Sequence, residues 1–368
     1  MQITAAVLRA ADAPYRLEPI ELAEPGIGEI RVRVVGAGLC HTDLLPRAAG
    51  FELARPPIIT GHEGSGVIDA VGAGVTEVAP GDHVVLSFDS CHGCGSCVSG
   101  HPAYCDTFFL RNLTGVDLTG QQRVVDADGE PVAGRWFGQS SFATHALVDA
   151  RNVVKVDPSL PLELLGPLGC GVQTGAASVL VALDVQAGTS VVVFGAGGVG
   201  LSAVMAAKVA GAAVIVAVDL NEKRLALATE LGATHTINGH SADLHEQLVA
   251  ATGGAHYALD TTGVPSVIQT AIAALRPRGT VGLVGVQQGD LVIDPAALAV
   301  GRNVMGILEG DAVPQVFIPR LIALWQQGRF PFDRLIETFP LEQINEAEQA
   351  MAKGDVVKPV LLPDGAAR

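Results

Sequence analysis

The chain has 368 residues, enough for two domains with sizeable hydrophobic cores. Apolar residues make up 49% and charged residues 17%, which fits a compact globular protein and excludes an intrinsically disordered one. The formal net charge is −15 and no Lys/Arg cluster occurs, which argues against nucleic acid or an anionic membrane as a partner.

The first residues, MQITAAVLRA, lack the basic and apolar regions and the cleavage site of a secretion signal, so we expect a cytoplasmic protein. Strand-like segments at 4–9 and 29–35 alternate with Pro/Gly turns and predict an antiparallel β-rich start. In a reducing compartment, we expect the six cysteines to be metal ligands or free thiols rather than disulfides.

A cysteine and a histidine follow in two glycine-containing segments, GLCHTD at 38–43 and GHEG at 61–64. Cys40 and His62 each stand near a carboxylate and can form part of a zinc site. On their own, they are equally typical of a buried thiol and a hydrogen-bonded core histidine.

Four further cysteines follow the spacing C-x2-C-x2-C-x7-C, at Cys91, Cys94, Cys97 and Cys105. Four thiolates complete a tetrahedral zinc site with no open position, so the spacing predicts a structural zinc. Iron–sulfur clusters use other ligand spacings, and a redox thiol pair would not need four cysteines. With the coordination sphere filled, we expect His92 and His101 to be surface residues.

Between 107 and 150 we expect mainly loops, with a polar turn at 126–134 and an aromatic-flanked segment at 136–142. The sixth cysteine, Cys170, comes just before an Ala-rich helix expected over 174–183.

The segment VVVFGAGGVG at 191–200 predicts a strand, a glycine turn and a helix that continues to Ala210. Gly195 permits the tight turn, Gly197 lets the backbone approach a pyrophosphate, and Gly200 lets the helix pack closely on the strand. A second strand, 213–218, ends at Asp219, nineteen residues after the turn. That carboxylate can accept from both ribose hydroxyls and repels a 2′-phosphate, which favours NAD over NADP.

Two other interpretations of this segment are a flavodoxin-like turn whose glycines serve packing alone, and a membrane span. The acidic residue at the right distance argues against the first. The glycines divide the apolar stretch into pieces too short for the second.

Alternating units continue the core and complete six strands, the number of a doubly wound α/β dinucleotide fold. The expected helices are 221–231, 242–251 and 264–275, and the expected strands are 234–237, 256–260, 280–286 and 304–308. The tail predicts helices over 314–327 and 343–353 and a strand over 358–362.

With these motifs in this order, the whole chain resembles the zinc-containing medium-chain alcohol dehydrogenases. The segments GHEG, FGQSSF and GPLGCG resemble most the bacterial aryl-alcohol (benzyl alcohol) and geraniol dehydrogenase branch. The resemblance implies a β-rich GroES-like catalytic domain over 1–171 with a zinc lobe at 88–106. It also implies a Rossmann NAD-binding domain over 172–309 and a return of 310–368 to the first domain.

The resemblance further implies roles at the reaction centre. Cys40, His62 and Cys170 would hold the catalytic zinc, and Glu63 would stand behind the metal as a transient ligand. Asp43 would orient His62, and Thr42 would accept the proton of the alcohol. In the liver-type enzymes a histidine three positions after the hydroxyl residue ends the proton relay; here Leu45 stands there, so bulk water or His41 would take the proton.

For the cofactor, the resemblance places residues at three parts of NAD. The pyrophosphate would meet His41, Lys358 and the turn residues Gly195, Gly197, Gly198 and Gly200; the adenosine ribose would meet Asp219 and Arg224; the nicotinamide would meet Thr174, Val199, Val284 and Val286. The substrate pocket would be lined by Phe88, Trp136, Phe137 and Leu308.

The activity expected from this resemblance is reversible, zinc-dependent oxidation of hydrophobic primary alcohols, aryl or allylic, with hydride transfer to NAD⁺. The partner would be a small alcohol or aldehyde, and the chain would form a homodimer or homotetramer through the strand at 304–308. The alternatives are a zinc dehydrogenase of aliphatic alcohols or polyols, and a non-catalytic NAD-binding protein of the same fold. A zinc-free quinone or enal reductase would lack the cysteine and histidine ligands.

Overall fold

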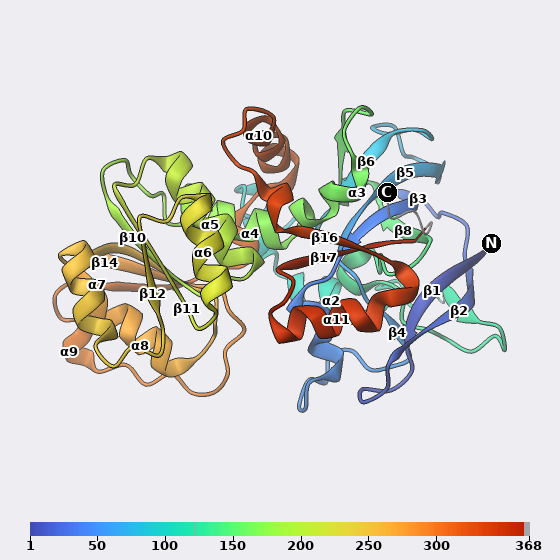
Figure 1. The fold of residues 1–368 in the computed structure, drawn as a ribbon. Helices are drawn as coiled ribbons and strands as arrows, with labels where there is room; N and C mark the ends of the chain where they lie inside the picture. Colours follow the sequence, from blue (N-terminus) through green and yellow to red (C-terminus); the bar gives the residue numbers. More distant parts are fainter. Residues whose placement is uncertain (122, 364–368) are drawn as a thin grey trace. The chain divides into compact units, whose positions relative to one another are not determined.

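The computed structural model describes residues 1–121 and 123–363, which separate into two compact units (Figure 1). Unit 1 contains Met1–Cys170, Val313–Pro319 and the described residues from Asp333 on. Unit 2 contains Gly171–Ala312 and Arg320–Phe332. The sequence analysis grouped 310–368 with the first domain, whereas Arg320–Phe332 packs with unit 2.

Unit 1 is built on two sheets, and its first strands pair antiparallel, as the pattern at its start predicted. The smaller sheet has the order β4-β1-β2-β7, with β1 (Gln2–Leu8), β2 (Tyr15–Leu22), β4 (Ile58–Ile59) and β7 (Val124–Asp126). The larger has the order β16-β17-β3-β5-β6-β9, with β8 also paired to β3. Its strands are β3 (Glu29–Gly38), β5 (Glu63–Val71), β6 (His83–Leu86), β8 (His145–Asp149), β9 (Val153–Val156), β16 (Ile336–Pro340) and β17 (Lys358–Leu362).

The central strand of the larger sheet, β3, explains how distant parts of the chain meet. Its register pairs Gly38 with Glu63 of β5 on one side and with Val360 of β17 on the other. The end of β3, the start of β5 and the C-terminal strand therefore lie at the same place in the sheet. Short helices complete the unit: α1 (Gly95–Val98), α2 (Phe108–Asn112), α3 (Leu162–Leu165) and α11 (Ile344–Lys353).

Unit 2 contains a six-stranded parallel sheet of order β12-β11-β10-β13-β14-β15. This is the strand order of the doubly wound dinucleotide fold, which confirms the predicted fold class. The strands are β10 (Ser190–Phe194), β11 (Val214–Asp219), β12 (His235–Asn238), β13 (Ala255–Asp260), β14 (Leu275–Leu283) and β15 (Asn303–Gly306).

Helices cover both faces of this sheet (Figure 1). They are α5 (Gly198–Ala210), α6 (Glu222–Leu231), α7 (Leu244–Thr252), α8 (Pro265–Ala274) and the short α9 (Pro295–Leu298). Val192 and Phe194 of β10 join the core formed with α7 and α8, while Val193 lies toward α5. Because both faces are covered, β10 is buried along its whole length and is apolar from Val191 to Phe194 instead of alternating. Before the sheet, α4 (Gly171–Ala177) continues into a π-helical turn at Ser178–Ala182.

α10 (Pro314–Gln326) has residues in both units. Within the described residues, no single helix is long and apolar enough to cross a membrane, although the bent pair Leu162–Gly169 and Gly171–Ala182 meets the length and composition limits together.

Candidate metal centres and cofactor turn

Four side chains with metal-binding atoms gather where β3, β5 and β17 meet: Cys40, His62, Glu63 and Cys170, here called the Cys/His cluster. Their ligand atoms lie within 4.8 Å of one another. Cys40 comes two residues after β3, His62 and Glu63 lie at the start of β5, and Cys170 ends the short helix η5 (Gly166–Gly169). The structure therefore brings together the residues that the resemblance assigned to the catalytic zinc.

The environment of His62 fits a metal ion. Its Nδ1 lies 2.7 Å from Asp43 Oδ1, and both side chains are fully buried. Its Nε2 is buried and has no hydrogen-bond partner among the described residues. A buried ring nitrogen without a partner, beside two thiols, is the arrangement expected of a zinc ligand.

The charged and polar groups around the Cys/His cluster shift the pKa values of Cys40 and His62 in opposite directions. The hydrogen bond from Cys170, supported by the positive charge of Lys358 and opposed by burial, lowers the pKa of Cys40 well below its usual range. A lowered pKa favours the thiolate, which is the form that binds metal. Burial lowers the pKa of His62, but the Asp43 carboxylate outweighs it and raises that pKa.

Asp43 holds this arrangement in place. Besides His62, its Oδ1 accepts from the Gly61 backbone N–H at 2.9 Å and from Trp136 Nε1 at 3.2 Å. Its Oδ2 accepts from the backbone N–H of Cys40 at 3.1 Å. One buried carboxylate thus fixes the backbone beside both ligands and the direction of the imidazole.

Trp136, which the resemblance placed at the substrate pocket, is bonded to Asp43. Its ring is fully buried, and its N–H is bonded to Asp43, so it supports the carboxylate that orients His62. Phe137, the next residue, stacks on His62 with ring centroids 4.4 Å apart and an interplanar angle of 29°. It has a positive φ of 50°, which turns the chain back at this point.

An aromatic cluster extends from Phe137. Phe108 lies 6.3 Å from Phe137 and 5.7 Å from Phe88, measured between ring centroids. The sequence analysis named Phe88 and Phe137 but missed Phe108, because nothing in the loop-like stretch after the last lobe cysteine marks it as part of this cluster.

Lys358, which the resemblance placed near the pyrophosphate, is paired with Glu63. Its ammonium is bonded to Glu63 Oε1 at 2.8 Å, Glu63 Oε2 at 2.9 Å and the Leu39 carbonyl at 3.2 Å. Its side chain is 4% exposed, so the pair is buried inside unit 1. Burial lowers the pKa of Lys358 and the charge of Glu63 more than reverses this, which keeps the lysine protonated.

The neighbours of Cys40 lie on the short helix η1 (His41–Arg47). The half-buried Thr42 has its hydroxyl 3.8 Å from Cys40 Sγ, next to the cluster. His41 is exposed and Leu45 is half-buried.

The second metal-binding group, the four-cysteine cluster, consists of Cys91, Cys94, Cys97 and Cys105, whose sulfurs lie within 4.8 Å of one another. All are free thiols. Backbone N–H groups of Asp106 and Cys97 lower the pKa of Cys94 to about 6, while burial raises that of Cys97 to about 12. His92 and His101 are exposed, as predicted.

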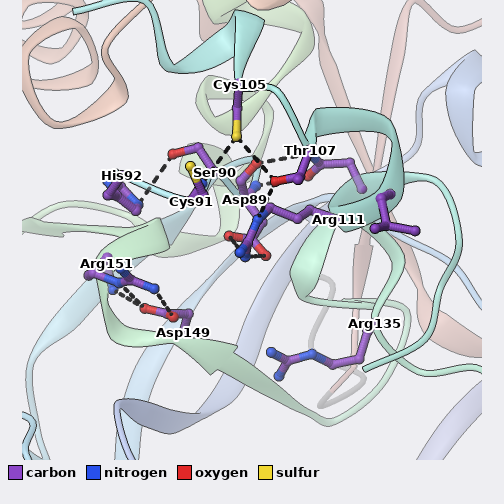
Figure 2. A network of polar contacts seen from close by, with 12 residues as sticks. Asp89, Ser90, Cys91, His92, Cys105, Thr107, Arg111, Arg135, Asp149 and Arg151 are labelled. Carbon is purple, nitrogen blue, oxygen red and sulfur yellow. Dashed lines mark hydrogen bonds and ion pairs between the residues drawn. The ribbon is translucent and has the colours of Figure 1, made fainter. Parts of the chain in front are cut away.

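A polar chain links the four-cysteine cluster to the rest of unit 1 (Figure 2). The Thr107 hydroxyl lies 3.4 Å from Cys105 Sγ and accepts from Arg111 Nε at 2.9 Å. Arg111 also pairs with Asp89 at 3.2 Å. The Asn112 side chain makes two hydrogen bonds to the backbone of Asp89: its amide N–H donates to the Asp89 carbonyl, and its oxygen accepts from the Asp89 N–H. The sequence analysis missed these residues, because polar side chains in a short helix carry no signal of what they contact.

In unit 2, the glycine turn lies between β10 and α5. Gly195 has φ of +92°, and an alanine methyl at Gly200 would lie 1.8 Å from the Gly195 carbonyl oxygen, so both positions need glycine. Asp219 Oδ2 accepts from the Ala196 N–H at 2.6 Å and Oδ1 from the Asn221 N–H at 2.8 Å. Asp219 therefore fixes the turn as well as standing at the end of β11.

The other residues assigned to the cofactor occupy several places in unit 2. Gly198 and Val199 begin α5, and Arg224 is half-buried on α6. Val284 and Val286 follow β14, and Thr174 is 6% exposed on α4. Leu308 is half-buried after β15.

Two family models match the chain: "Alcohol dehydrogenase GroES-like domain" over residues 26–158 and "Zinc-binding dehydrogenase" over residues 198–326. Geraniol dehydrogenase from Castellaniella defragrans is 48% identical over 97% of this chain and 97% of its own length.

Two solved structures are also similar along nearly the whole chain. An alcohol dehydrogenase zinc-binding domain protein from Burkholderia ambifaria is 50% identical, with a TM-score of 0.96 and coverage of 99% of each chain. Benzyl alcohol dehydrogenase from Acinetobacter calcoaceticus is 43% identical, with a TM-score of 0.94 over 98% of this chain and 99% of that one. Together with the two cysteine-containing clusters and the six-stranded parallel sheet, these matches show that the chain belongs to the zinc-binding alcohol dehydrogenases, whose cofactors are zinc and NAD.

Proposed function

We propose that this alcohol dehydrogenase oxidises hydrophobic primary alcohols, aryl or allylic, to aldehydes, with NAD⁺ as hydride acceptor. The observation that carries the proposal is the buried Cys/His cluster, in which His62 Nε2 has no partner among the described residues while Phe137 stacks on the same ring. The names of the geraniol and benzyl alcohol dehydrogenases support the same substrate class.

Cys40, His62 and Cys170 would hold zinc, which would lower the pKa of an alcohol bound there toward neutral pH. NAD held at the glycine turn would accept the hydride. The chain's own contribution is positioning: Asp43 orients His62, and the aromatic cluster of Phe88, Phe108 and Phe137 provides apolar surface beside it.

The proton of the alcohol would pass to the Thr42 hydroxyl, which lies 3.8 Å from Cys40 Sγ, while that hydroxyl gives its own proton onward to bulk water or His41. Glu63 would serve as a transient fourth ligand only when Lys358 releases it, because both carboxylate oxygens are bonded to that ammonium.

Initial rates of NAD⁺ reduction with benzyl alcohol, geraniol, ethanol and sorbitol test this proposal, with NADP⁺ in a parallel set. We expect the first two alcohols to react well ahead of ethanol and sorbitol, and NAD⁺ to be preferred because Asp219 repels a 2′-phosphate. Thr42→Val should abolish most of the rate, and Thr42→Ser should keep it. Preference for sorbitol, or for NADP⁺, would contradict the proposal.

A further inference from the structure

Three consecutive residues after β15 have positive φ. They form the short helix η7 (Glu309–Asp311), with φ of 49° at Glu309, 70° at Gly310 and 57° at Asp311. Residues other than glycine rarely adopt this region, and such backbone persists only where the surrounding structure holds it, typically at functional sites.

Packing against α4 holds η7 in this conformation. A methyl group at Gly310 would lie 2.5 Å from the Ala177 Cβ and 2.9 Å from the Thr174 carbonyl oxygen, so the two elements are in close contact. The Glu309 carboxylate accepts from the Thr174 hydroxyl at 3.2 Å, and Glu309 is only 6% exposed. The strained turn thus directs an acidic side chain into unit 2 instead of into solvent.

The Glu309 carboxylate lies on the side of the sheet where a dinucleotide binds. In a parallel sheet the dinucleotide binds beyond the carboxyl ends of the strands, and η7 follows the carboxyl end of β15. α4 also lies against the glycine turn region, since a methyl group at Gly175 would be 2.0 Å from the Val199 carbonyl oxygen. Glu309 therefore lies at the end of the sheet where the cofactor binds, beyond the carboxyl ends of the strands.

The position of Glu309 among the strands indicates which half of the cofactor lies near it. The doubly wound sheet consists of two mononucleotide-binding halves. Asp219, at the end of β11, marks the half that takes the adenosine ribose, so the half formed by β13, β14 and β15 takes the nicotinamide nucleotide. Glu309 belongs to this second half.

We propose that Glu309 sets the preference of the site for oxidised over reduced cofactor. The nicotinamide ring carries a positive charge in NAD⁺ and none in NADH, so a buried carboxylate near it stabilises the oxidised form selectively. This inference rests on the proposed function for NAD binding and adds a residue that distinguishes its two redox states.

The dissociation constants of NAD⁺ and NADH, measured by titration calorimetry and NADH fluorescence, test the inference. In Glu309→Gln the side chain still accepts from Thr174 but loses its charge, so we expect the ratio Kd(NAD⁺)/Kd(NADH) to rise by about tenfold. Glu309→Ala should shift the ratio in the same direction, which keeps the test valid if one variant fails to fold. Asp311→Asn, the same charge change two residues away, should leave the ratio within about twofold of wild type.

If Glu309 only packs η7 against α4, its variants weaken both forms of the cofactor equally and the ratio stays constant, which would overturn the inference alone. Failure of the wild-type protein to bind either form would overturn the proposed function as well.

Discussion

Asp43 Oδ1 accepts three hydrogen bonds, from Gly61, His62 and Trp136, so one atom decides the orientation of a metal ligand. Two of these three partners are side chains, and of them Trp136 carries no ligand role in the proposed mechanism. Its contribution is a third hydrogen bond to the buried carboxylate oxygen that orients His62.

Trp136→Phe keeps the buried ring and removes the N–H donor. Partners of a ligating histidine typically contribute 10–100-fold to metal affinity, so we expect zinc affinity to fall by about tenfold at this more distant position. Competition with a chromogenic chelator measures the affinity, and the visible spectrum of the cobalt-substituted protein reports the geometry of the site.

The control for this variant is Trp325→Phe, which changes the tryptophan that packs on Phe332 in unit 2. It should leave zinc affinity and the cobalt spectrum unchanged. Equal effects of the two variants would show that Trp136 acts only through general stability.

At the residue scale, the spacing of the four cysteines between 91 and 105 predicted the four-cysteine cluster, whereas the members of the Cys/His cluster followed from the family resemblance. The sequence could not predict that Lys358 pairs with Glu63 or that Trp136 is bonded to Asp43. These contacts join residues 295 and 93 positions apart, and they depend on strand register and on buried packing that a single sequence does not display.

At the scale of elements, the glycine turn uses glycine for two different purposes, close packing and approach of the cofactor. An alanine methyl at Gly200 would collide with the Gly195 carbonyl oxygen at 1.8 Å, whereas a methyl at Gly197 would meet nothing within 4 Å. Gly197 also has φ of −81°, which any residue can adopt. Packing therefore requires glycine at 200 and leaves 197 open to the cofactor.

We therefore expect Gly197→Ala to keep the thermal stability of the wild type while the affinity for NAD⁺ falls by about tenfold, because the methyl group blocks approach of the pyrophosphate. Gly200→Ala should lower the free energy of unfolding by about 1–3 kcal/mol through overpacking. Thermal unfolding and NADH fluorescence titration distinguish the two. Undiminished cofactor binding in Gly197→Ala would refute the assignment of this turn.

Long elements with a regular apolar pattern were predictable, such as α5, α6, α10 and β17. The strand β8 lies in a stretch expected to be loop, because its Ala-Leu-Val centre is buried on both faces and shows no alternation. The edge strand β16 ends in proline and needs only one hydrogen-bonded neighbour, so it has little strand signal.

At the scale of the whole molecule, unit 1 carries both metal-binding clusters and unit 2 carries the glycine turn. The fold class and the family followed from motifs spread over the full chain, whereas the assignment of Arg320–Phe332 to unit 2 depends on packing. A cytoplasmic location and a homodimer or homotetramer stay predictions.

The most direct test of the central claim is zinc content measured together with activity in three forms of the protein: wild type, Cys40→Ser and Cys94→Ser. The two ligand clusters predict two zinc ions per chain in the wild type. Cys40→Ser should lose one zinc and nearly all alcohol oxidation while its Tm stays close to that of the wild type. Cys94→Ser should lose the other zinc and be less stable, because a closed four-cysteine site contributes folding energy. Full activity in Cys40→Ser, or in wild-type protein stripped of both zinc ions, would contradict the account.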